Sequence, residues 1–319
     1  MPGRLLGIDF SGSADEWQAS RRNSSVWIAF ASADGPRLRI DDLKPVQKLP
    51  GVGAPFERLR ALLAAEPDAT AAIAAPFSLP RRYAASAALL WAEAASLAPP
   101  GRPFGSGADL VASLAPESRP NGLRLYRACE AAWRKRRLEV RSSLSCGPGQ
   151  GAAAALACMT LLHLHAGPIW PFRPDGDGAM LVEAFPPAQL SAWGLSPTGH
   201  GGRKPQAASA RLKILQALAR DHGLRAADDV LRRSAESADA LDAVICAYAA
   251  KAMAEGRHPR RLPAVARSEG WMVIDDPTQP AEPGPKRLED ARLVDPSAER
   301  RIRRLFASVR GAAEEGEAV

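Results

Sequence analysis

The segment 237–250 is the most restrictive feature of the sequence, because it has a helical pattern and is apolar except for two carboxylates, Asp239 and Asp242. Residues three apart project from neighbouring points of one helix face, so the two carboxylates share one patch. A buried or half-buried carboxylate pair is costly unless the charges are paired, protonated or bound to a cation. The pattern therefore indicates a helix that supplies ligands to a divalent metal ion.

Helix capping also accounts for these two acids. Ser and Asp are favoured at helix N-caps, which would suit Asp239. Asp242, further along the first turns, would complement the positive end of the helix dipole. The sequence leaves metal binding and capping open.

The N-terminal segment 4–13 predicts a short buried strand that ends at Asp9 and leads into a turn of small residues. An acid at the end of a first strand is chemically accessible and structurally fixed. Asp before Gly and Ser is also ordinary turn chemistry, and the same segment would suit a loop that binds phosphate.

A third acid, Glu183, lies in the segment 178–190, where an apolar strand leads into a Pro-Pro turn and the start of a helix. Together the sequence has an acid ending an early strand, an acid in a later strand and an acid pair on a late helix. Ribonuclease H-like nucleases hold metal ions with this arrangement.

With these motifs in this order, the chain resembles the bacterial family catalogued as domain of unknown function 429, a group of predicted nucleases in the ribonuclease H-like superfamily. The resemblance spans roughly residues 4–275. It implies an α/β fold, a ribonuclease H-like mixed sheet flanked by helices with a helical insertion. The motifs that carry it are Gly7-Ile-Asp-Phe-Ser-Gly12, Ala75-Pro-Phe-Ser-Leu-Pro80, Tyr126-Arg-Ala-Cys-Glu130, Trp170-Pro-Phe172, Val182-Glu-Ala-Phe-Pro186, Asp239-Ala-Leu-Asp-Ala243 and Glu269-Gly-Trp-Met-Val273.

The stretch from Glu183 to Asp242 is also similar to the second half of the Holliday-junction resolvase RuvC. A Pro-rich turn, a Gly-Lys loop at 201–206 and an Asp-Ala helix follow one another in this order. The resemblance implies that Lys204 presents its charge to the scissile phosphate. An ordinary charged surface loop is the alternative.

The family resemblance implies hydrolysis of phosphodiester bonds with Mg²⁺ or Mn²⁺, hard cations that prefer carboxylate ligands. Asp9 would be the bridging ligand and Asp242 a second ligand. Glu183 or Asp239 would complete the site or orient water, and Lys204 would supply a positive charge. Two ions roughly 3.5–4 Å apart can activate the water and stabilise the developing charge.

The chain departs from the family pattern at one strand. The family usually has an apolar strand that ends in Asp before Pro76, whereas this chain has Ala74 and Ala75 there. Either Glu183 takes over part of the missing acid's task, or the protein binds one metal ion, or its catalysis is weakened. Nearby in the pattern, Arg127 and Glu130 either line the site or pair with each other at i and i+3.

Composition agrees with a nucleic-acid partner without requiring one. The chain has 42 basic and 35 acidic side chains, a formal charge of +7 and a pI near 9.6, which suits a polyanion, DNA or RNA. Its four cysteines show no Cys-x-x-Cys spacing, and its most apolar run is too short to span a bilayer. We therefore expect a soluble cytoplasmic protein with no membrane partner.

The predicted organisation is one ribonuclease H-like domain over residues 1–275, interrupted by a helical insertion at 81–177, and a linker and tail at 276–319. The expected strands are 5–9, 25–32, 37–41, 70–75 and 271–274, and the expected helices are 56–66, 125–141, 152–163, 206–222, 226–233, 238–254 and 298–313.

Two other functions remain open from the sequence. The segment 7–12 also resembles the first phosphate loop of actin-like and sugar-kinase-like ATP-binding proteins, although no Gly-Gly adenosine motif follows a predicted strand. A nucleic-acid binder without catalysis would explain the missing strand acid.

Overall fold

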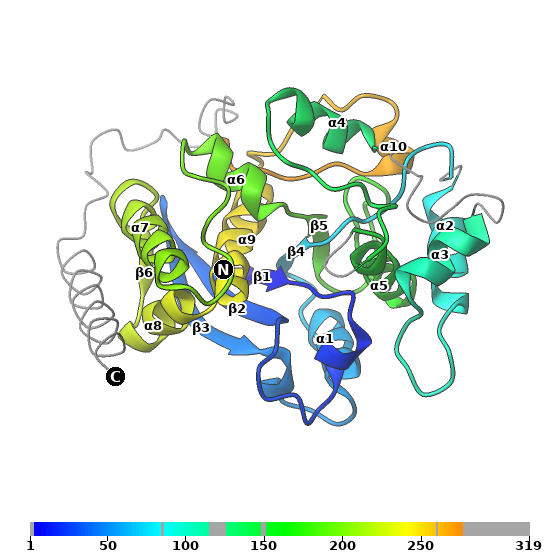
Figure 1. Ribbon diagram of the computed structural model, residues 1–319, viewed down its shortest axis with the longest axis horizontal. Coiled ribbons are helices and arrows are strands. Elements are labelled where there is room, and N and C mark those ends of the chain that lie inside the picture. Colours follow the sequence, from blue (N-terminus) through cyan, green and yellow to red (C-terminus); the bar gives the residue numbers. More distant parts are fainter. Residues whose placement is uncertain (1–2, 84–85, 115–125, 148–150, 260, 277–319) are drawn as a thin grey trace.

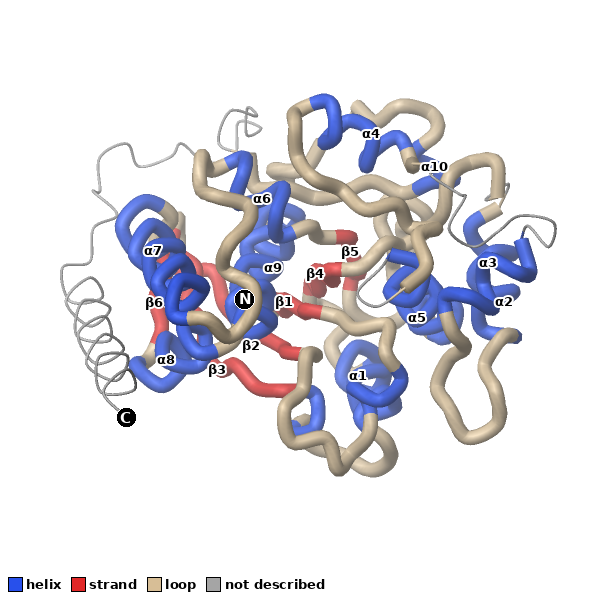
Figure 2. Tube along the Cα trace, in the orientation of Figure 1, coloured by secondary structure: helices blue, strands red, loops and turns tan. Residues whose placement is uncertain are grey.

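The computed structural model describes residues 3–83, 86–114, 126–147, 151–259 and 261–276. Its centre is a six-stranded mixed sheet with the strand order β5-β4-β1-β2-β3-β6 (Figure 2). This α/β arrangement confirms the predicted fold class and is consistent with a ribonuclease H-like sheet. The strands are β1 (Leu5–Asp9), β2 (Trp27–Asp34), β3 (Arg37–Pro45), β4 (Thr70–Ala74), β5 (Met180–Glu183) and β6 (Leu224–Ala226).

The first three strands form an antiparallel meander, as the closely spaced strand patterns predicted. The other neighbours, β1 with β4, β4 with β5 and β3 with β6, are parallel. Asp9 therefore ends β1 directly opposite Ala74 of β4. The carboxyl ends of β1, β4 and β5 lie at one edge of the sheet.

Helices flank the sheet on both faces (Figure 1). The predicted helix 238–254 coincides with α9, and the other predicted helices before residue 277 are present with shifted ends. The helical elements are η1 (Ala14–Trp17), η2 (Val46–Lys48), α1 (Pro55–Ala64), α2 (Ala87–Ser96), α3 (Gly107–Leu114), α4 (Ala128–Lys135), α5 (Gly151–Leu164), α6 (Pro186–Ala192), α7 (Pro205–Asp221), α8 (Asp228–Glu236), α9 (Ala238–Ala254) and α10 (Ala266–Glu269).

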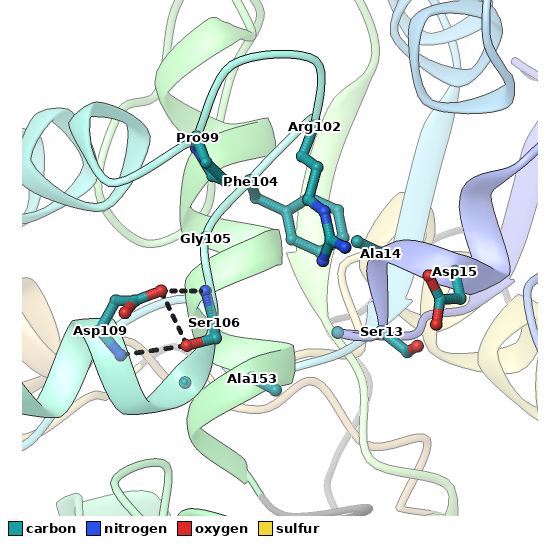
Figure 3. A pocket seen from close by; sticks show the side chains of 12 residues that line it. Ser13, Ala14, Asp15, Pro99, Arg102, Phe104, Gly105, Ser106, Asp109 and Ala153 are labelled. Carbon is teal, nitrogen blue, oxygen red and sulfur yellow. Dashed lines mark hydrogen bonds between the residues drawn. The ribbon is translucent and has the colours of Figure 1, made fainter.

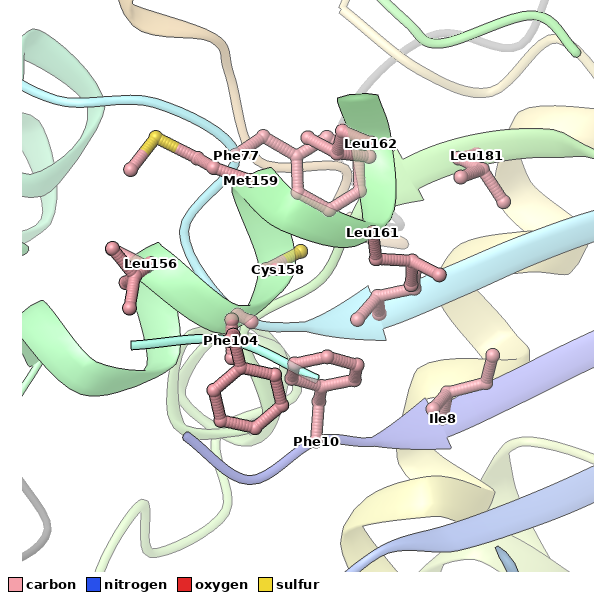
Figure 4. Packing of buried hydrophobic residues seen from close by; sticks show 14 of the residues in the cluster. Ile8, Phe10, Phe77, Phe104, Leu156, Cys158, Met159, Leu161, Leu162 and Leu181 are labelled. Atoms are coloured by element: carbon pink, nitrogen blue, oxygen red, sulfur yellow. The ribbon is translucent and has the colours of Figure 1, made fainter. Parts of the chain in front are cut away.

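Strand alternation divides the core into two layers. Leu6 and Ile8 of β1 belong to the apolar cluster that contains α1 and α5, and Figure 4 shows side chains of α5 over Ile8 and Leu181. Leu5 belongs to the other cluster, with α7, α8 and α9. The helix α9 is buried along almost its whole length, as its apolar sequence indicated.

The helix α5 belongs to the main core, although it lies within the segment 81–177 that we predicted to be an insertion. α2 and α3 pack on α5 instead of on the sheet, and Figure 1 shows them at the outer side of α5. Residues of α2 and α3 also belong to this apolar cluster, so all three helices extend the core on one face of the sheet.

Two predicted elements differ from the structure. The expected strand 271–274 contributes only one isolated bridge, between Met272 and Glu183. The expected helix 125–141 is shorter, because Arg137 adopts a left-handed backbone conformation with φ of 63° just after α4. The predicted tail, with its helix 298–313, falls outside the described residues. Within the described part, no helix has the length and apolarity needed to cross a membrane.

Candidate metal centre

Three of the predicted site residues, Asp9, Asp239 and Asp242, come together at the carboxyl edge of the sheet. Gly7 and Asp9 are two residues apart on β1, so their side-chain positions lie on the same face of the sheet. A Cβ atom on Gly7 would lie 2.0 Å from the carbonyl oxygen of Ala243 in α9. The Asp9 side chain is therefore on the face that α9 covers. The close approach of β1 to α9 brings the strand acid to the helix acids.

The N-cap of α9 is Ser237, whose side chain accepts a hydrogen bond of 3.2 Å from the backbone N–H of Ala240. Asp239 is consequently not the cap, so capping no longer accounts for it. It lies in the first helical turn, where the helix dipole favours a carboxylate. The helix dipole does not explain why the strand acid Asp9 lies near Asp239.

Burial and neighbouring carboxylates raise the pKa of two of these acids, Asp9 and Asp239. Burial, then the charges of Asp242 and Asp239, hold the pKa of Asp9 well above its usual range, against one backbone N–H from Phe10. Burial, followed by Asp242 and Glu16, raises the pKa of Asp239 to about 6, although Arg211 acts in the opposite direction. No cationic side chain is among the causes of the Asp9 shift, so a cation bound beside Asp9 would favour its ionised form.

His200 is a buried side chain of this site that the sequence did not reveal. Its Nε2 atom lies 3.2 Å from Oδ1 of Asp242, and its Nδ1 atom is buried with no hydrogen-bond partner among the described residues. Burial opposes protonation of the ring, but the hydrogen bond and charge of Asp242 outweigh it and raise the pKa of His200. His200 thus holds one oxygen of Asp242 in a defined direction.

Arg211 of α7 holds the loop that carries His200. Its guanidinium donates to the carbonyl oxygens of His200 at 2.6 Å and Gly202 at 3.0 Å, and to that of Ala235 at 2.7 Å. Arg211 is buried, and it therefore fixes the loop relative to the end of α8. The sequence pattern of α7 did not predict that Arg211 holds this loop, because its partners are backbone carbonyl groups outside the helix.

Glu183 lies on the opposite face of the sheet from Asp9. It is in register with Ile73, which faces α5, whereas Ala72 and Val182 face α9. Its carboxylate accepts two hydrogen bonds from Arg127, of 2.6 and 2.7 Å, and one of 3.0 Å from the N–H of Phe77. The structure does not bring Glu183 to the three aspartates, and its predicted metal-ligand role would require Arg127 to release it.

Arg127 is the centre of a buried ion network. Besides Glu183 it contacts Glu130 at 2.9 Å, which confirms that the i and i+3 residues pair, and the carbonyl oxygen of Glu269 at 3.2 Å. Glu269 in turn accepts from the N–H of Ala128 and of Arg81. The network joins α4, α10, the end of β5 and the segment after β4.

The remaining predicted residues are at the edges of this site. Lys204 is exposed and directly precedes α7, so it is accessible to a ligand, and its contact with phosphate remains a prediction. Ala74, one of the two positions at which the sequence lacks the expected strand acid, is opposite Asp9 in register. A carboxylate at Ala74 would therefore lie on the strand next to Asp9.

The acids are within electrostatic range but do not converge on one point. Among the described residues, no three His, Cys, Asp or Glu side chains form a group that could hold a metal ion as they stand. The carboxylate oxygens are donors that still fit a hard cation. Binding would require the carboxylates to rotate toward a common centre.

Two cavities adjoin the carboxyl edge. One, of about 290 Å³, lies between the turn after β1 and the start of α3. Figure 3 shows Arg102 beside Phe104, and Asp109 bonded to Ser106. Asp15 and Asp109 both line this cavity, so its charge does not favour a phosphate.

Gly12, in the turn after β1, is explained by packing. A Cβ atom on Gly12 would lie 2.1 Å from the backbone of Ala153 in α5. The small residue is therefore required for helix packing, and the ATP-binding alternative gains no support from it.

The second cavity is a cleft of about 350 Å³ over the ends of β4 and β5, which we call the edge cleft. Ala74, Glu183 and Thr198 are among the residues that line it. It is considered further below.

Comparison with known families identifies the chain. The family model described as "Protein of unknown function (DUF429)" matches residues 7–267. The chain belongs to the DUF429 family. No curated protein and no solved structure matches it.

Proposed function

We propose that this DUF429 protein is a metal-dependent nuclease in which Asp9, Asp239 and Asp242 hold a divalent cation, Mg²⁺ or Mn²⁺. The observation that carries the proposal is the meeting of a strand acid with two helix acids, where burial and the charges of neighbouring carboxylates raise the pKa of Asp9 and Asp239. Pairs of acids with perturbed pKa values are typical of functional sites.

The geometry favours one cation over two. The strand position next to Asp9 is occupied by Ala74, and Glu183 is held by Arg127 on the other face of the sheet. Of the three possibilities left open by the sequence, replacement of the missing acid by Glu183 is therefore the least supported.

Each residue of the site has a distinct task in this proposal. When bound, a divalent cation would supply positive charge for the phosphate and help to activate water. Asp9, Asp239 and Asp242 provide oxygen ligands, and His200 orients Asp242. Lys204 is exposed beside the His200 loop and is available to an anionic substrate.

The test is cleavage of labelled single-stranded, duplex, RNA–DNA hybrid and four-way-junction substrates in Mg²⁺ or Mn²⁺. Asp242→Asn should abolish cleavage that the wild type shows, whereas Asp34→Asn, an exposed acid at the end of β2, should leave it unchanged. Wild-type protein that binds nucleic acid in a salt-sensitive manner without cleaving any substrate would instead support a non-catalytic binder.

A further inference from the structure

The edge cleft opens beside the candidate metal centre. Ala74, one of its lining residues, is opposite Asp9 in the sheet. Thr198, another, lies two residues before His200, which contacts Asp242. A group bound in the cleft would therefore lie next to the acids.

The residues that line the edge cleft are mainly apolar, and charged side chains, Glu139 and Arg141 among them, also line it. Leu138, Val140, Phe185 and Met272 contribute apolar surface. Glu183 also lines the cleft, and its Oε1 atom accepts only one protein hydrogen bond among the described residues. A carboxylate oxygen has room for a further donor. The cleft therefore suits a flat group with an apolar face and N–H donors on its edge.

A strip of positive charge adjoins the cleft. Residues 134–137 are Arg-Lys-Arg-Arg, and all four are exposed. The guanidinium groups of Arg134 and Arg136 lie over the rings of Tyr126 and Trp133, at 4.3 and 4.8 Å from the ring centres. We call residues 134–137 the basic strip. The chain runs directly from this strip into the cleft wall at Leu138.

Arg137 combines an exposed charge with an unusual backbone conformation. A non-glycine residue with φ of 63° is uncommon at the end of a helix, where glycine is the usual choice. Here a long, exposed basic side chain occupies the position, and the next residue, Leu138, lines the cleft. Phosphate groups are the complement of such a run of cations.

We propose that the edge cleft binds an unpaired nucleobase and that the basic strip binds the phosphates flanking it, so that the substrate class is single-stranded nucleic acid. The catalytic consequence rests on the proposed nuclease function, but binding itself does not. In a duplex the bases are stacked and paired, and one of them would have to be flipped out to enter the cleft. Single strands offer their bases directly.

The cleft is tested by binding measurements in EDTA, so that no result depends on hydrolysis. Fluorescence anisotropy would compare a labelled single strand, its duplex and an abasic strand of equal length. Thr198→Trp fills the cleft mouth from an exposed position, and Thr198→Ala is the matched control. We expect Thr198→Trp to weaken single-strand binding about tenfold, the scale of one bound base, and Thr198→Ala to change it less than about twofold.

The abasic strand separates base from backbone binding. Both Thr198 variants should bind it as the wild type does, since it has no base to enter the cleft. Equal weakening of abasic and normal strands by Thr198→Trp would overturn the assignment of the cleft. So would wild-type protein that binds duplex as tightly as single strand.

The basic strip is tested by the salt dependence of binding. The double variant Lys135→Ser with Arg137→Gly should lower the slope of log affinity against log salt by roughly 1.4, the value for two lost contacts to single-strand phosphates. The control, Arg22→Ser with Lys213→Ser, removes two exposed charges elsewhere and should leave the slope unchanged. Equal effects of both pairs would overturn the assignment of the strip.

These outcomes are independent of catalysis. If Thr198→Trp weakens binding as expected but no substrate is cleaved in Mg²⁺ or Mn²⁺, the nuclease proposal fails and the base cleft stands. If cleavage occurs and depends on Asp242 but neither the cleft nor the strip variants alter binding, the nuclease proposal stands and the substrate assignment fails.

Discussion

Gly7 of β1 packs directly against Ala243 of α9, so closely that a Cβ atom at Gly7 would lie 2.0 Å from the Ala243 carbonyl oxygen. This contact is two residues from Asp9 on the strand and one residue from Asp242 on the helix. The separation of strand and helix at this point therefore sets the distance between the acids of the candidate metal centre.

Gly7→Ala should destabilise the protein, because the added methyl group meets backbone atoms that cannot move without shifting α9. Overpacking of this kind costs about 1–3 kcal/mol of unfolding free energy. Urea denaturation would measure the loss. Gly201→Ala, at a glycine with open space around its Cβ position, is the control and should change stability by less than about 0.5 kcal/mol. A Gly7→Ala protein as stable as the wild type would show that β1 and α9 are not in tight contact.

Asp239 should make stability depend on pH. Its pKa in the folded protein, about 6, exceeds the ordinary value of 3.8, so the folded state binds the proton more tightly than the unfolded state. The contribution to stability is fully present below pH 3.8 and is lost as the pH rises through about 6. Asp9 and His200 act in the same direction.

Asp239→Asn removes this dependence at one site. Without added metal, the variant should be more stable than the wild type at pH 8, by about 1 kcal/mol after allowance for solvent screening, and the difference should disappear near pH 4. Thermal denaturation across this range would measure it. A constant difference at all pH values would contradict the raised pKa.

Glu183→Gln should destabilise the protein whether or not Mg²⁺ is present. Breaking a buried ion pair leaves Arg127 partly uncompensated and costs about 3 kcal/mol or more. Asp242→Asn should have a small effect on stability in EDTA but should abolish stabilisation by Mg²⁺. Denaturation with and without Mg²⁺ distinguishes the two roles. A Glu183→Gln protein that is stable but no longer responds to Mg²⁺ would restore Glu183 as a metal ligand.

His200→Ala should weaken Mg²⁺ binding about 10- to 100-fold, because residues that orient a metal ligand typically contribute on this scale. His200→Gln, which can still donate to Asp242, should recover part of the loss. Calorimetric titration with Mg²⁺ would measure the affinity. His163→Ala, at an exposed histidine of α5, is the control. Unchanged affinity in His200→Ala would remove His200 from the site.

Arg137→Gly should raise stability by roughly 0.5–1 kcal/mol, because glycine adopts the left-handed conformation at this position without steric cost. Thermal denaturation of the single variant would show a higher midpoint. A lower midpoint would mean that Arg137 contributes stabilising contacts greater than the conformational gain.

The sequence by itself determined the elements that depend on local pattern. The short buried run of β1, the strand patterns of β2 and β3 and the helical period of α9 are local features, and together they predicted the α/β class. The order of the family motifs added Asp9, Asp239 and Asp242 as site residues, and the fold brings these three together.

Only the tertiary structure decided which of the acids meet. Glu183 and Asp9 both end strands, but their side chains point to opposite faces, and a shift of register by one residue would reverse this. The partners of Glu183 and Asp242 are Arg127 and His200, 56 and 42 residues away along the chain. No local period encodes strand register or contacts between distant loops, because they arise only when the packed layers bring those residues together.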